Sequence, residues 1–148
     1  MSGKPFRFRL QNVLSLRQRE ADQAEAALAQ AQRARSEQAA VVAEAVGAQN
    51  RLSAQYAQAQ AGGIRSVRQH EGFRRDAHRR VADAQRLLDA ADRRIAEAKR
   101  VLRLHRTNAE TLDTLRKSHA EAHERAQRDA EMQQLDEQAL RVYARHSS

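Results

Sequence analysis

Apolar residues recur between residues 77 and 102 at alternating intervals of four and three positions. These positions are Ala77, Val81, Ala84, Leu88, Ala91, Ile95, Ala98 and Leu102, and mostly Arg and Asp stand between them. An average period of 3.5 residues keeps one narrow stripe of a helix facing a partner helix for as long as the pattern lasts. The pattern predicts a coiled-coil helix that needs one partner and leaves its other faces in water.

The same spacing runs from Leu10 to Ala59, where eleven of fifteen positions are apolar. The seam is interrupted by polar residues, among them Arg35, Gln38 and Gln49. This predicts a first helix over about residues 10–60. Residues 1–9 form a basic arm in which aromatic and polar residues alternate, a pattern that also fits a short strand. Because no other strand signal is present, we expect an arm that leads into the helix.

The first helix is predicted to end at Gly62 and Gly63, because glycine has no Cβ and adopts non-helical dihedral angles without a steric penalty. Gly72 extends the uncertain region, so the turn is expected over about residues 61–73 and the second helix over about 74–145. The fold class is therefore all-α: a long antiparallel two-helix coiled-coil hairpin with a longer second helix, in a single coiled-coil domain over 1–148. Folding about the two glycines places large residues opposite small ones, for example Leu28 opposite Ala98.

In this register the second helix extends beyond the first, and about residues 117–145 have no partner within the chain. The extension keeps apolar positions among acidic ones, which makes it a candidate docking surface; a solvated, fraying helix end is the alternative. Its apolar residues are Ala126, Ala130, Leu135, Leu140, Val142 and Tyr143.

Composition agrees with long helices rather than a thick core. The 148 residues include three Phe, two Tyr, no Trp and one Pro, and 31% are charged. No cysteine is present, so thiolate chemistry and disulfides are excluded. No apolar run follows the basic start, so we expect neither a signal peptide nor a membrane span, and a cytoplasmic location.

The net charge of +8 is uneven along the chain. Residues 1–61 carry 8 basic and 5 acidic residues, 62–106 carry 13 and 6, and 107–148 carry 6 and 8. The basic residues of 62–106 recur all round the predicted helix among acidic ones, and Phe73 is the sole aromatic there. This favours a solvated face, or contact with an acidic protein or a lipid surface, over nucleic acid.

Candidate chemistry is sparse. His119 and His123 are spaced so that they share one helical face, but no third metal ligand with suitable spacing follows, and the other histidines are expected to be solvated or at the seam edge. Phosphate-binding glycine motifs and nucleophile motifs are missing. We therefore expect no enzyme, no catalytic residue, no metal, no cofactor and no small-molecule substrate.

The two ends of the chain resemble those of the FliJ family of the flagellar type III export apparatus. The segments are 6–17 (FRFRLQNVLSLR), where aromatic and basic residues enter a Leu-rich helix, and 135–145 (LDEQALRVYAR), where an Asp-Glu pair precedes Ala and a basic residue. The resemblance implies a non-enzymatic central stalk. It would bind the hexameric flagellar export ATPase, promote its assembly and activity, and link it to a membrane export-gate protein at the cytoplasmic face of the inner membrane. Export chaperones are further partners that the family suggests.

Residues are carried over from the resemblance for two contacts. The ATPase-facing residues would be Lys4, Arg7, Arg9, Arg17, Asp136, Glu137, Arg141 and Arg145. The residues facing the export gate would be Leu52, Tyr56 and Phe73, although Leu52 and Tyr56 also fit the last layers of the seam. Two alternatives stay open: an injectisome stalk homologue, which shares the architecture, and a basic coiled coil that binds nucleic acid or an anionic membrane.

Overall fold

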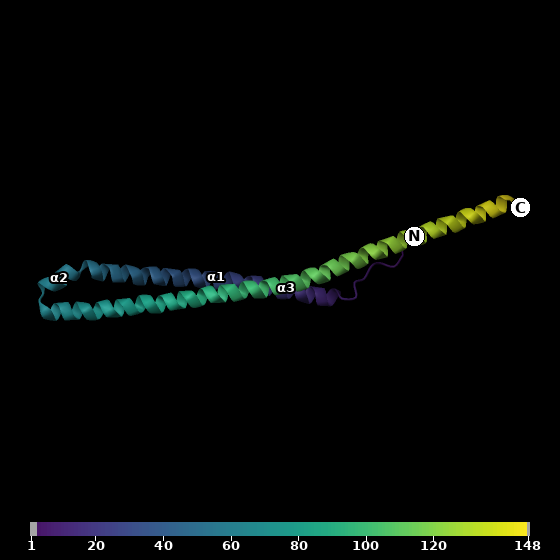
Figure 1. Ribbon diagram of the computed structural model, residues 1–148. Coiled ribbons are helices and arrows are strands. Elements are labelled where there is room, and N and C mark those ends of the chain that lie inside the picture. The colour runs from purple at the N-terminus through teal and green to yellow at the C-terminus, as the bar shows by residue number, and fades with distance from the viewer. Residues whose placement is uncertain (1–2, 148) are drawn as a thin grey trace. The chain divides into compact units, whose positions relative to one another are not determined.

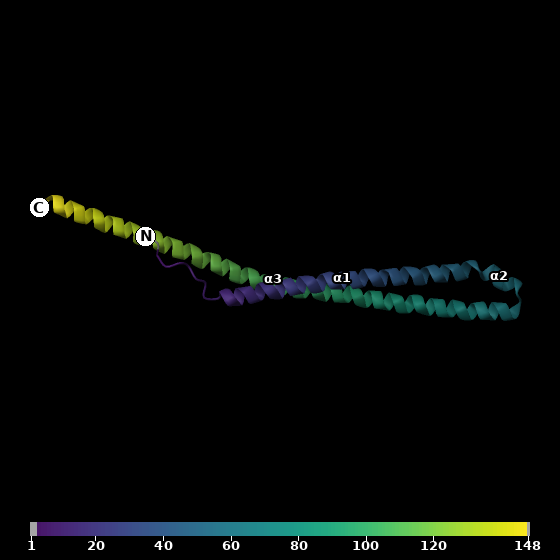
Figure 2. The ribbon, with the colours of Figure 1, turned by 180° about the vertical axis from the view of Figure 1, so that it is seen from behind.

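A computed structural model gives the structure of residues 3–147, and 92% of these described residues are helical. Helix α1 spans Gln11–Ala54, α2 spans Tyr56–Ala61 and α3 spans Ile64–Ser147. No strand occurs among the described residues. The long helices α1 and α3 run side by side in opposite directions in both views (Figures 1 and 2). The predicted all-α antiparallel fold with a longer second helix is confirmed.

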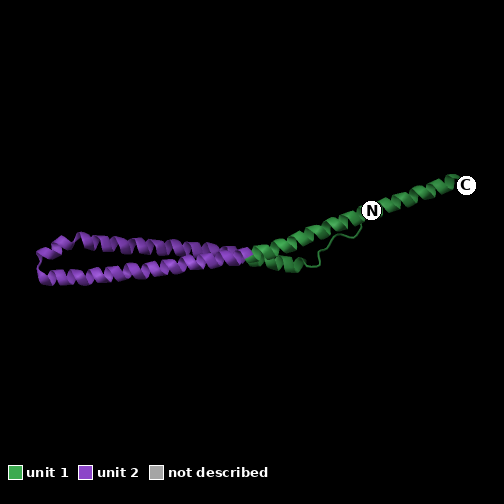
Figure 3. Cartoon of the chain, viewed as in Figure 1, with its two compact units in different colours: residues 1–21, 104–148 green, residues 22–103 purple. Residues whose placement is uncertain are grey.

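Contacts divide the chain into two compact units (Figure 3). Unit 1 comprises Met1–Ala21 and Leu104–Ser148, and unit 2 comprises Asp22–Arg103. Unit 2 contains the hairpin turn, and unit 1 contains the start of α1 and the end of α3. That both units belong to a single domain stays a prediction.

The predicted seam is the buried stripe of unit 2. Ala77, Ala84, Ala91 and Leu102 are buried, and the four positions between them in the pattern are half-buried. Alanine at alternate steps lets two helix backbones approach closely. Cross-helix contacts agree with the predicted register: the Gln38 side-chain amide donates to the Ala84 carbonyl at 3.1 Å, and Arg35 pairs with Asp92 at 2.9 Å.

The turn is shorter than the sequence analysis expected. The prediction of a turn region reaching residue 73 is wrong, because α3 already begins at Ile64 and continues through Gly72. Two glycines suffice for the reversal. Gly63 has a φ of 88°, and a Cβ on Gly62 would lie 2.7 Å from the Cβ of Ser66.

The first helix is interrupted at Gln55, which the sequence analysis did not predict. In a continuous α-helix the Leu52 carbonyl would accept a hydrogen bond from the Tyr56 amide. Here Nε2 of His70 on α3 lies 2.7 Å from that carbonyl, and the Gln55 amide is shared between the Arg51 and Leu52 carbonyls. The helix therefore breaks where a side chain from the other arm of the hairpin binds its backbone.

The N-terminal arm of unit 1 packs on α3 instead of projecting into solvent. The ring of Phe8 is buried and meets His119 edge-on at 5.8 Å, while the Phe6 ring lies 5.7 Å from His123. Further along, the Gln127 side-chain amide donates to the Lys4 carbonyl at 3.3 Å.

Extended chain advances about 3.3 Å per residue and an α-helix about 1.5 Å, so each arm residue covers about two residues of α3. The four steps from Phe8 to Lys4 accordingly match the eight from His119 to Gln127. The expectation that α3 has no partner from residue 117 onward is therefore wrong. Among the described residues, α3 is exposed on every side only from residue 128 to residue 147.

We expect Gly63→Ala to lower the free energy of unfolding by about 1–2 kcal/mol, because a Cβ disfavours positive φ. Gly72→Ala is the matched control: Gly72 is helical, and nothing lies within 4 Å of its added Cβ. That change should stabilise the protein by about 0.5–1 kcal/mol. Chemical denaturation followed by circular dichroism measures both, and equal shifts for the two variants would contradict the turn geometry.

We expect Phe8→Ala to release the arm from α3, since it removes the buried ring that anchors it. The protein has no cysteine, so a spin-label pair can be attached through Lys4→Cys and Arg128→Cys alone. Electron-electron double resonance should give a narrow, short distance in the parent and a broad one in Phe8→Ala. Phe6→Ala, at a half-buried ring, should broaden it less. An unchanged distribution in Phe8→Ala would refute the anchoring role.

Candidate functional site

The basic residues of the arm are exposed to solvent, whereas Phe8 between Arg7 and Arg9 is buried. Lys4, Arg7 and Arg9 are exposed, and the chain from residue 3 to residue 8 has no regular secondary structure. Arg17, one and a half turns into α1, is half-buried and pairs with Glu20 at 3.1 Å. Three of the four basic residues expected at this end are therefore accessible to a partner, and Arg17 is engaged within the chain.

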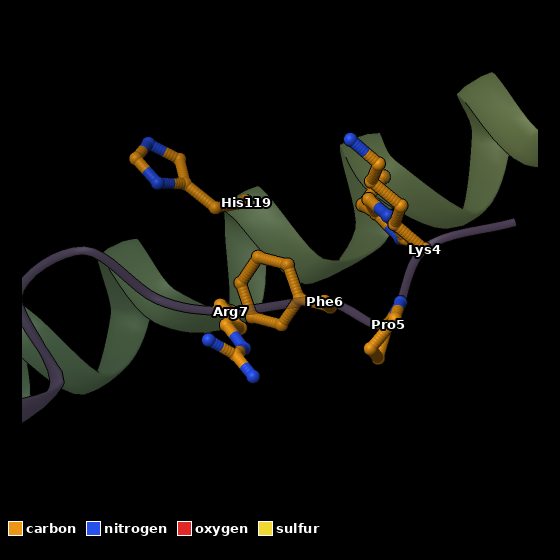
Figure 4. Close-up of a pocket in the computed structure, with 6 residues that line it drawn as sticks. Lys4, Pro5, Phe6, Arg7 and His119 are labelled. Carbon is orange, nitrogen blue, oxygen red and sulfur yellow. The ribbon is translucent and has the colours of Figure 1, made fainter.

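A shallow depression lies where the arm meets α3 (Figure 4). It is open to solvent and lined by Lys4, Pro5, Phe6, Arg7, His119 and His123. Figure 4 shows the arm running along the helix with the ring of Phe6 over it. An open hollow of this kind does not enclose a ligand as small-molecule sites do. It presents a cationic and aromatic surface to a larger partner.

The remaining ATPase-facing candidates lie on the exposed end of α3. Asp136, Glu137, Arg141 and Arg145 all fall within residues 128–147, and the side chains there are exposed. At about 100° per residue, Glu137, Arg141 and Arg145 continue the line of His119 and His123 along the helix. Beyond Gln127 the face that holds the arm carries Ala130 and Gln134, and it becomes charged from Glu137 onward.

Apolar residues of the same segment occupy a different side of α3. Met132, Leu135, Ala139 and Val142 follow a three-four-three spacing, roughly 140° around the axis from the face that holds the arm. The side chains of Met132 and Leu135 are 60% and 61% exposed. The end of α3 therefore offers a charged line and an apolar stripe on nearly opposite faces. The sequence analysis noted some of these apolar residues but did not separate the two faces.

The three gate-facing candidates lie near the turn of unit 2, around His70. Leu52 and Phe73 line a common depression with His70. Phe73 is exposed, Leu52 is half-buried, and Tyr56 places its ring 5.6 Å from that of His70. Tyr56 directly follows the break at Gln55 and is exposed, although its ring contacts His70 of α3.

His70 organises this end of unit 2 and was missed from the sequence. It is only 7% exposed, and its Nε2 must carry the hydrogen because the Leu52 carbonyl can only accept. Its Nδ1 is buried without a partner. The sequence does place His70 in the seam, because the four-three spacing of the seam continues backward from Ala77 through residue 74 to residue 70. It was not predicted there because residues 61–73 were expected to form the turn.

Glu71 near the turn is paired within its own helix. Hydrogen bonds from the Arg74 guanidinium, at 2.7 and 3.0 Å, lower the pKa of Glu71 below its usual value. Glu71 therefore stays ionised at neutral pH, in a pair within one helix. The exposed side chains near the turn therefore include Phe73 together with Arg65 and Arg68.

His119 and His123 serve packing, since each ring contacts a phenylalanine of the arm. Within residues 3–147, no group of three or more His, Asp or Glu side chains is placed to hold a metal ion. The search over the same residues found no helix with an apolar stretch long enough to cross a membrane.

The sequence was compared with protein families, curated proteins and solved structures. The family model described as flagellar FliJ protein matches residues 6–148, which include both end segments discussed above. The search of curated proteins returned no match, and neither did the search of solved structures. Because the family match covers nearly the whole chain, this protein belongs to the FliJ family, non-catalytic components of the flagellar export apparatus.

Proposed function

We propose that this chain acts as the stalk of the flagellar export ATPase. In this proposal unit 1 binds the ATPase hexamer and promotes its assembly and activity, and the turn end of unit 2 contacts the membrane export-gate protein. The protein would work at the cytoplasmic face of the inner membrane. The observation that carries the proposal is the exposed end of α3, held beside an anchored basic arm.

A helix that is exposed on all sides suits a partner that surrounds it. Residues 128–147 have no buried side chain, so an encircling ring could contact the charged line and the apolar stripe together. The stripe would supply contact area, and the charged line with Lys4, Arg7 and Arg9 would supply electrostatic complementarity. Anchoring by Phe8 reduces the conformational entropy that the arm would lose on binding.

Both candidate sites lie on one uninterrupted helix. Helix α3 carries His70 and Phe73 near its start and the exposed segment at its end. The only proline of the chain is Pro5, outside the helices, so no proline kink interrupts α3. We infer that α3 couples the ATPase to the gate by contact at its two ends, with no chemistry on this chain.

The ATPase contact is tested with the double variant Arg141→Glu and Arg145→Glu. Charge reversal places repulsion in the interface, so stimulation of ATP hydrolysis by the cognate ATPase should fall at least tenfold and hexamer formation should decline. The matched control is Arg68→Glu with Arg93→Glu, two exposed arginines of unit 2. If the parent chain changes neither hydrolysis nor hexamer formation, the stalk proposal is wrong. Salt-sensitive binding to DNA or anionic vesicles would then favour the alternative function.

The gate contact is tested with Phe73→Ala. Loss of an exposed aromatic anchor should weaken binding to the cytoplasmic part of the gate protein about tenfold, measured by calorimetry. It should leave ATPase stimulation unchanged, which separates the two contacts. Leu104→Ala is the control, because Leu104 is also 51% exposed but belongs to unit 1. Equal affinities of the two variants would remove Phe73 from the gate site.

A further inference from the structure

We propose that a groove along one face of unit 2 binds an acidic amphipathic helix of a partner protein. The groove lies between α1 and α3, and its apolar walls include Val41, Ala45 and Ala48 of α1 with Ala84 and Leu87 of α3. Val41 and Leu87 are 51% and 60% exposed. This surface is separate from the residues assigned above to the ATPase and the gate.

The two sides of the seam differ in chemistry. On the side away from the groove, polar contacts cross between the helices: Arg35 pairs with Asp92, and the Gln49 amide lies 3.4 Å from Nδ1 of His78. On the groove side the flanking positions of α1 at heptad intervals are Ala27, Ala34, Val41 and Ala48. The groove side also has a polar contact across the helices, from the Gln38 amide to the Ala84 carbonyl, but its flanking residues are apolar and leave apolar surface open.

The shape of the groove favours a helix as its occupant. Two antiparallel helices in a coiled-coil pairing present a continuous furrow, and a third helix fills it in a three-helix bundle. Val41 and Leu87 rise from the two walls and would contact apolar residues on one stripe of that helix. Small alanines between them let its backbone approach.

The charges at the rim select an acidic partner. The two acids at the groove are already satisfied, because Glu44 pairs with Arg51 at 3.1 Å and Asp83 pairs with Arg86. Arg80, also at the groove, has no ion-pair partner among the residues that the structure describes. Arg80, Leu87 and Arg94 are spaced seven residues apart, so they lie in one line along α3, and Arg94 is also exposed.

The resulting pattern is basic, apolar, basic at successive heptads. It fits a helix with an apolar residue opposite Leu87 and an acidic residue one heptad away on each side. Two-fold pairing with a second copy would instead bring Arg80 and Arg94 of one copy near those of the other, which is repulsive. The apolar floor equally disfavours a phosphate backbone, which needs polar or cationic contacts along its length.

A synthetic probe tests the groove on the full chain. The probe is a 22-residue helical peptide with Leu and Ala on one stripe and Glu one heptad to either side of its central Leu. Its matched control carries Lys in place of those two Glu residues. Fluorescence anisotropy at low salt should show the Glu peptide binding at least tenfold more tightly than the Lys peptide, with the difference shrinking as salt is added.

Variants locate the binding. Leu87→Glu and Val41→Glu, one on each wall, should each weaken binding of the Glu peptide at least tenfold. Val46→Glu is the control, because Val46 is an exposed valine of α1 that does not line the groove. Arg80→Glu combined with Arg94→Glu should invert the preference toward the Lys peptide. Circular dichroism checks that each variant stays helical, and each should still stimulate the ATPase, which keeps this test independent of the stalk proposal.

Three results would overturn the inference. One is equal affinity for the Glu and Lys peptides, and another is equal weakening by Val46→Glu and Leu87→Glu. The third is a stable dimer in light scattering that Leu87→Glu dissociates, which would assign the groove to a second copy of the chain.

Discussion

A seam one side chain wide, built largely from alanine, is the constraint on which the rest of this structure depends. Alanines at 77, 84 and 91 are buried while larger residues at the intervening steps are half-buried. Such a seam holds two helices closely together but covers only a narrow part of each. The other faces must be compatible with water or with partners. Within residues 3–147 most side chains are therefore exposed or half-buried, and few are fully buried.

The polar residues within the seam give the hairpin two unlike sides. Arg35 and Gln38 occupy seam positions, and each reaches across to α3, to Asp92 and to the Ala84 carbonyl. Polar groups in a narrow core are tolerated when they find partners across it, and such pairing also helps to fix register. The groove at Val41 and Leu87 lies on the side away from the Arg35 and Gln49 contacts, and the Gln38 contact to the Ala84 carbonyl lies within it.

Contacts between distant parts of the chain shape both ends. At the turn, His70 binds the Leu52 carbonyl where the first helix breaks, and its ring contacts that of Tyr56. At the other end, Phe8 packs on His119, and the basic residues of the arm are exposed to solvent. In each case one buried side chain lies beside exposed residues that a partner can reach. For a FliJ family protein these are the ends proposed to contact the gate and the ATPase.

The periodicity of the sequence by itself determined the helical fold, the seam, its antiparallel register and the reversal at Gly62 and Gly63. These features depend only on a helix and the helix packed against it, so the four-three spacing of apolar residues is enough to predict them. The end segments likewise indicated the family, since the resemblance rests on residues read directly. Only the tertiary structure decided the course of the arm, the role of His70 and the start of α3 before Gly72. Those depend on contacts such as the one between Lys4 and Gln127, 123 residues apart, and no local pattern encodes which distant side chain will satisfy a carbonyl or cover a ring.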